Sequence, residues 1–268
     1  MAGRVKIQAT KIWADGSTQG FTAALNQPYL NKPNDCGTLN MSDAEMEELM
    51  RSRISRGRQI MVHSNGDRAT DQTLRSYAKV LKELPNRDPK IMHRIEHFTV
   101  TEPRQLKTAY DLGLDVTHLI GHVNYWGEAF KTWVLGAERA DRLDPVKEDL
   151  DNDLVYSFHS DSPVTEVDPL QYVQTAVTRQ LNNILPPTIL GPGQCVELIA
   201  ALRGITINPA KQVLMADMIG SLEVGKAADL VIIEQDPREV DKGKLGSIEV
   251  LETWLEGRKV DNEEVKTG

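Results

Sequence analysis

The chain has 268 residues, of which 40% are hydrophobic and 26% are charged, a composition typical of globular proteins. Its formal net charge of −8 argues against nucleic acid or an anionic membrane as the main partner, because both are bound through basic surfaces. No run approaches the roughly 18 apolar residues that a membrane helix needs, and the two cysteines lie too far apart in the sequence for a zinc or redox motif.

Strand and helix patterns alternate along the first 200 residues. Five segments read as strands: VKIQATKIWA (5–14), QIMVH (59–63), KIMHRIEH (90–97), LDVTHL (114–119) and LVYSFHSD (154–161). The segments between them include amphipathic helices, and strands that alternate with such helices form parallel βαβ units. The sequence therefore predicts an α/β fold.

Five helices are expected from apolar positions at a 3.6-residue spacing and from capping residues. They cover 42–57 with Ser42 as the N-cap, about 74–84, 101–113 with Thr101 as the N-cap, about 169–181 and about 194–202. The stretch 15–41 contains several helix breakers and is expected to be irregular.

The pattern changes in the last fifty residues. Residues 220–237 and 248–260 read as short β runs with turns and no helix between them. We therefore divide the chain into an α/β part, 1–215, and a β appendage, 216–268.

Four of the five predicted strands end at or near a residue that can bind a metal, namely Lys11, His63, His97 and Asp161. The carboxyl ends of parallel strands open onto one face, where barrel enzymes build their active sites. Two neutral imidazoles and a carboxylate can hold a Zn²⁺-like ion, and Asp161 could take a proton while hydroxide attacks a carbonyl. Each residue alone has a structural alternative, as a hydrogen-bonded histidine, a turn aspartate or a snorkelling lysine. Their recurrence at successive strand ends favours a metal site.

At these motifs the chain resembles the C-terminal part of the amidohydrolase superfamily, in the large group that includes N-substituted formamide deformylases. The matching segments are KIWADGSTQGFTAAL, MVHSNGDRA, RIEHFTV, HVNYWGEAF, SFHSDSPVTEVDPL and IGSLEVGKAADLVIIEQDP. The resemblance implies a partial (β/α) TIM-type barrel, about strands four to eight, followed by a small β-sandwich segment. Within it, Lys11 would be a metal-bridging carbamate, His63 and His97 metal ligands, and Asp161 both ligand and proton shuttle.

The resemblance also gives roles to residues after the seventh strand. His122 and Trp126 would lie in a loop, line the substrate pocket and polarise the scissile carbonyl. The alternatives are an exposed loop histidine for His122 and loop packing for Trp126. His93, His118 and His159 are interpreted as structural.

One family motif is absent, because the six histidines include no His-x-His pair. Five parallel strands also leave open edges, which invite pairing with another chain. We therefore expect either a homo-oligomer or a 15–41 stretch that folds over an edge. The N-terminal residues MAGRVKIQAT contain no apolar signal segment, so the expected location is cytoplasmic.

The leading hypothesis is a metal-dependent hydrolase of C–N bonds in small amide-like, non-peptide substrates. It would use metal-activated hydroxide and a divalent metal, with zinc as the expected ion. One alternative is a non-catalytic partial barrel, retained as a binding module or present as an incomplete gene product. A different βα-barrel lyase or isomerase is a third possibility, but such barrels have no reason to carry the segment GSLEVGKAADLV.

Overall fold

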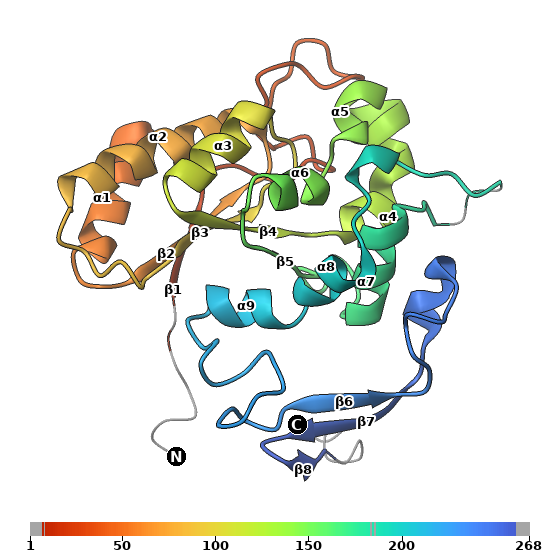
Figure 1. Cartoon of the computed structure of the whole chain (residues 1–268). Helices are drawn as coiled ribbons and strands as arrows, with labels where there is room; N and C mark the ends of the chain where they lie inside the picture. Colours follow the sequence, from red (N-terminus) through yellow and green to blue (C-terminus); the bar gives the residue numbers. More distant parts are fainter. Residues whose placement is uncertain (1–6, 8, 183, 185, 261–268) are drawn as a thin grey trace.

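The computed structural model describes residues 7, 9–182, 184 and 186–260, so positions 5, 6 and 8 of the first predicted strand lie outside it. Its main element is a sheet of five parallel strands in the order β1-β2-β3-β4-β5 (Figure 1). The strands are β1 (Ala9–Trp13), β2 (Gln59–Ser64), β3 (His93–His97), β4 (Leu114–His118) and β5 (Tyr156–Phe158). The predicted α/β class and parallel pairing are confirmed.

Alternation of side chains along the strands gives this sheet two different faces. In β2, Ile60 and Val62 are fully buried, whereas Met61 and His63 point the other way and are only half-buried. The buried face packs under α1 (Asp43–Ile54), α2 (Asp67–Glu83) and α3 (Pro103–Asp111), which lie together above the sheet in Figure 1. The uncovered face carries the polar side chains of the candidate site.

Helix ends follow local capping chemistry. Ser42 accepts a hydrogen bond from the Glu45 N–H, and the Glu45 side chain accepts from the Ser42 N–H, so the predicted cap of α1 is confirmed. The prediction of Thr101 as the cap of α3 was wrong by one residue. Glu102 is the N-cap, and Gln105 closes the box from within the helix.

The segment between β4 and β5 is helical, and the prediction of a loop there was wrong. Four short helices fill it: α4 (Gly121–Ala129), the π-helix η1 (Phe130–Val134), α5 (Ala137–Asp141) and α6 (Val146–Asp151). Many glycine, asparagine and aromatic residues in α4 weaken the local helix pattern. Burial of one side of the segment, including Val123 and Phe130, stabilises it as helix.

The remaining helices are α7 (Pro169–Thr178), η2 (Pro192–Gln194), α8 (Leu198–Arg203), α9 (Ile207–Gln212) and η3 (Lys242–Ser247). The predicted helix 169–181 ends earlier, because Arg179 adopts a left-handed conformation. The predicted helix 194–202 begins only at Leu198. No helix in the described part of the chain is long and apolar enough to cross a membrane.

The C-terminal residues include the predicted short strands. An antiparallel sheet in the order β6-β7-β8 is built from β6 (Leu230–Ile233), β7 (Val250–Leu255) and β8 (Arg258–Lys259). It lies below the main sheet and apart from it in Figure 1. The prediction of no helix between these strands was wrong, because η3 lies between β6 and β7.

In the described chain, β1 and β5 are the edges of the main sheet, and barrel closure is not observed. The irregular stretch 15–41 covers only the carboxyl end of β1, where Asn40 bonds the main chain of Trp13, Ala14 and Asp15. The rest of the β1 edge has no partner among the described residues, so an oligomer that covers it stays a prediction.

The buried side chain of His93, on β3, makes the free energy of unfolding depend on pH. Its Nδ1 accepts a hydrogen bond from the Ile60 N–H at 3.1 Å, and burial lowers the pKa of His93 to about 4. Between about pH 4 and pH 6.5 the unfolded chain therefore binds a proton that the folded chain does not. We expect His93 to contribute roughly 3 kcal/mol to the fall in the free energy of unfolding as pH drops through this window, measured by urea denaturation.

The control for this prediction is His93→Gln. A glutamine carbonyl can accept from the Ile60 N–H without titrating, so the variant should lose the His93 contribution, while buried His97 and His159 keep theirs. An unchanged slope would show that another group causes it.

Candidate active site

Three histidines meet at the carboxyl ends of the central strands. The rings of His63 and His97 lie edge to face with centroids 4.4 Å apart, and His159 packs against His97 at 4.9 Å. The pairing of β2 with β3 places His63 and His97 at neighbouring tips, as the strand-end pattern predicts. His159, which its position two residues before Asp161 predicts to be structural, packs its ring against His97.

His97 occupies an unusual backbone position. Its φ is 74° and that of Phe98 is 47°, so two successive non-glycine residues are left-handed at the tip of β3. Both ring nitrogens of His97 are buried and have no hydrogen-bond partner in the described part of the chain. Buried polar atoms are almost always paired, so these orphaned nitrogens indicate a missing ligand.

The neighbouring His63 is oriented by the loop that follows β1. Its Nε2 lies 3.0 Å from the Gly16 carbonyl oxygen, which can only accept, and 3.0 Å from the Asn65 amide nitrogen, which can only donate. Because Asn65 Nδ2 already donates to the Gly16 oxygen at 2.8 Å, we place the proton on Nε2, where the Gly16 oxygen and the nearby Asp15 carboxylate can accept it, and the lone pair on Nδ1. Metal-ligating histidines commonly donate their second N–H in this way.

Both histidines are held in the neutral form that a metal requires. Burial lowers the pKa of His97 well below its usual range, and the charges on His159 and His63 act in the same direction. Burial also lowers the pKa of His63, against the hydrogen bond to Gly16 and the negative charge of Asp161.

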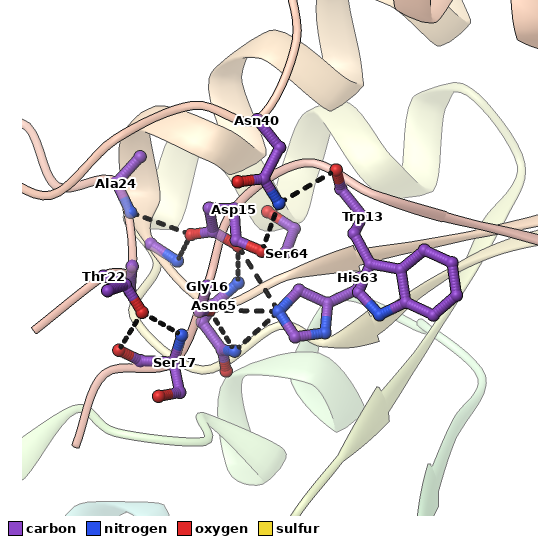
Figure 2. Close-up of polar contacts among 12 residues, drawn as sticks. Trp13, Asp15, Gly16, Ser17, Thr22, Ala24, Asn40, His63, Ser64 and Asn65 are labelled. Carbon is purple, nitrogen blue, oxygen red and sulfur yellow. Dashed lines mark hydrogen bonds and ion pairs between the residues drawn. The ribbon is translucent and has the colours of Figure 1, made fainter. Parts of the chain in front are cut away.

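Asp15 connects this site to the irregular stretch, and the sequence pattern did not identify it (Figure 2). Its carboxylate is buried and accepts main-chain N–H bonds from Ala24, Asn65 and Gly66 at 2.8–3.0 Å. Oδ1 also lies 3.6 Å from His63 Nε2. Burial raises the pKa of Asp15 to about 7, although the three N–H bonds oppose this shift. Asp15 therefore fixes the loop that orients His63.

Lys11 and Asp161 lie near the histidines without joining them. The β1–β2 register places Trp13, not Lys11, opposite His63, and Lys11 Nζ lies 5.6 Å from the Trp13 ring centroid. Asp161 is exposed and left-handed, three residues beyond β5, so the predicted strand to residue 161 was too long.

His122 and Trp126 lie on helix α4, and their prediction as loop residues was wrong. Their rings are 5.9 Å apart. His122 is buried, which excludes the exposed-histidine alternative, and Trp126 packs partly against the core. His122 Nδ1 faces Thr99 Oγ1 at 3.4 Å and Asp144 Oδ2 at 3.6 Å.

Two candidate metal ligands, His63 and His97, lie next to each other at this site. The lowered pKa values of His63 and His97 suit metal ligation in protonation, and the ring nitrogens of His97 have no hydrogen-bond partner among the described residues. No group of three histidine, cysteine or acidic side chains within binding distance is present among the residues that the structure describes. The chemistry of the histidine pair fits a divalent ion, but these two side chains alone are not a complete ligand set.

Comparison with known proteins shows the family of the chain. A model of the amidohydrolase family matches residues 1–261. The chain belongs to the amidohydrolase family. Among curated members, N-substituted formamide deformylase from Arthrobacter pascens is 30% identical over 249 residues, which cover 93% of this chain and 44% of that protein. The putative amidohydrolase YtcJ from Bacillus subtilis (strain 168) is 26% identical over 263 residues, 96% of this chain and 47% of that protein.

A solved structure of a metal-dependent hydrolase is similar over most of the chain. An uncharacterized metal-dependent hydrolase from Pyrococcus horikoshii OT3 superposes with a TM-score of 0.76 at 26% identity, over 91% of this chain and 47% of that one. This amidohydrolase-family chain thus spans about half the length of the relatives that it matches.

Proposed function

We propose that His63, His97 and Asp161 of this chain belong to the metal site of a hydrolase. The enzyme would cleave C–N bonds in amide-like, non-peptide substrates. The observation that carries the proposal is the pair of imidazoles, His63 and His97, which pack edge to face at adjacent strand ends, with both ring nitrogens of His97 unpartnered among the described residues. Family membership and the name of the Arthrobacter relative favour amide-like substrates.

The side chains have distinct proposed tasks. His63 and His97 would hold a divalent ion, with zinc as the expected metal, and that ion supplies Lewis-acid chemistry for attack of water on a carbonyl carbon. Asp161 would accept the proton of the attacking water at its carboxylate. Asp161 would also be a metal ligand, and Lys11 would complete the ligand set as a carbamate, because a protonated lysine ammonium has no lone pair to give to the ion.

A non-catalytic binding module is the second candidate. It is favoured by the absence of a three-ligand group among the described residues and by the placement of Lys11 against Trp13. In that case the chain would bind metal weakly and would hydrolyse nothing.

The test is hydrolysis by the zinc-loaded chain. With an N-substituted formamide as probe, we expect release of formate that requires zinc and stops with a chelator. Asp161→Asn should reduce the rate by at least about 100-fold, because general acid–base groups contribute factors of that size. His63→Ala should remove bound zinc, measured as metal per chain.

The matched control is His93→Gln, which changes a buried histidine on β3 away from the histidine pair. It should retain zinc and activity. Folded, zinc-loaded chain without formate release would reject the hydrolase in favour of the binding module.

A further inference from the structure

A buried cluster of acidic and imidazole side chains includes His122 of α4. Its other members are His118, Asp144 and Asp149. The Asp144 carboxylate sits between two imidazoles, with Oδ1 3.5 Å from His118 Nδ1 and Oδ2 3.6 Å from His122 Nδ1. His118 Nε2 lies 2.5 Å from Asp149 Oδ2. All four side chains are buried, so this arrangement is a chain of acid and imidazole groups that ends at His122.

The charges in this cluster balance. Burial would lower the pKa of His118, but the Asp149 and Asp144 carboxylates outweigh it and raise that pKa to about 9. The second cation is Arg179, which is fully buried and donates to the main-chain oxygens of Leu190, Asp144 and Leu143. Two cations thus compensate two carboxylates, and a third buried cation at His122 would have no counterion among the described groups of this cluster.

Hydrogen-bond donors and acceptors decide which nitrogen of His122 carries the proton. The Thr99 hydroxyl donates to Asn65 Oδ1 at 2.8 Å, so its oxygen can only accept from His122. The Asp144 carboxylate can also only accept, and at 3.6 Å it lies at ion-pair rather than hydrogen-bond distance from Nδ1, with neither oxygen hydrogen-bonded to a described residue. Both neighbours of Nδ1 therefore require an N–H there, and a neutral ring then has its lone pair on Nε2. No described residue forms a hydrogen bond with Nε2.

We propose that Asp144 is a positioning residue that holds His122 neutral with its proton on Nδ1, so that Nε2 accepts a hydrogen bond from an N–H of the substrate. Substrate contact at Nε2 rests on the proposed function, whereas the position of the proton does not. The role differs from the one that sequence analysis gave to His122, since a ring that polarises a carbonyl must donate from Nε2.

Histidine-ring ¹⁵N NMR of the folded chain at about pH 8 measures this directly. The chain has six histidines, and the spectrum of His122→Gln assigns the signal. We expect the wild-type His122 to show a protonated Nδ1 and an unprotonated Nε2. A proton on Nε2, or on both nitrogens, would overturn the proposal without any assay of activity.

Two variants separate the contributions of the two acceptors. Thr99→Val removes the uncharged acceptor, the Thr99 hydroxyl, and should leave the proton on Nδ1. Asp144→Asn lets an amide donate to Nδ1 and should move most of the proton to Nε2. If Asp144→Asn does not fold, the wild-type and Thr99→Val spectra still decide, because loss of the Nδ1 proton in Thr99→Val would assign the role to Thr99.

The substrate contact has its own readout. An N-monosubstituted formamide offers an N–H, and an N,N-disubstituted one does not. We expect kcat/KM at least about tenfold higher for the first, and a ratio near one in His122→Phe. Equal values in the wild type would reject the contact while leaving the proton position intact, and a chain that hydrolyses neither would reject the proposed function instead.

Discussion

His97→Leu is expected to stabilise the metal-free chain while removing its response to zinc. Both ring nitrogens of His97 are buried without partners, and an unpaired buried polar group costs about 1–3 kcal/mol. An apolar side chain removes that cost, so we expect a gain of about 1 kcal/mol and a Tm higher by about 2–4 °C in the presence of a chelator. Thermal unfolding measures the change.

Zinc should stabilise the wild type and not the His97→Leu variant. At a zinc concentration about 100 times Kd, the wild type should gain about 2.7 kcal/mol, whereas His97→Leu should gain almost nothing. A wild type that zinc does not stabilise, or a variant that responds equally, would remove His97 from the metal site.

His93→Leu is a matched control on the same strand. His93 is also buried, but its Nδ1 accepts the Ile60 N–H. Substitution leaves that N–H unpaired, so this variant should be less stable by about 1–3 kcal/mol and should keep the zinc response. Stabilisation by both substitutions would show that the effect comes from general hydrophobicity.

Asp15→Ala should be strongly destabilising. The carboxylate accepts three buried main-chain N–H groups, from Ala24, Asn65 and Gly66, and alanine leaves all three unpaired. We expect a loss of roughly 3–5 kcal/mol in the free energy of unfolding, measured by urea denaturation. Loss of the Asp15 anchor should also free the loop that carries Gly16, the acceptor of the His63 proton.

Asp35→Ala provides the comparison within the same irregular stretch. Asp35 accepts one main-chain N–H, from Gly37 two residues away, and it is less buried. Its loss should stay within about 1 kcal/mol. Similar effects of the two substitutions would contradict the anchoring role of Asp15.

Local patterns predicted much of the fold. The capping box of Ser42 and Glu45 spans four residues, as does the alternation of Ile60 and Val62 with Met61 and His63, so a short window contains the whole signal. Helix α4 shows where this fails. Its composition is a weak helix pattern, and burial against the rest of the molecule stabilises it.

The sequence by itself determined that the strands pair in parallel and that His63 and His97 lie at strand ends, because side-chain period and strand–helix alternation are local properties. Only the tertiary structure decided the left-handed turn at His97, the Asp15 bonds to residues 9 and 51 positions away, and the position of Asp144 between two histidines. Those features depend on which groups meet across the folded chain and on the loss of water around them. A short stretch of residues determines neither which groups meet nor how much water they lose.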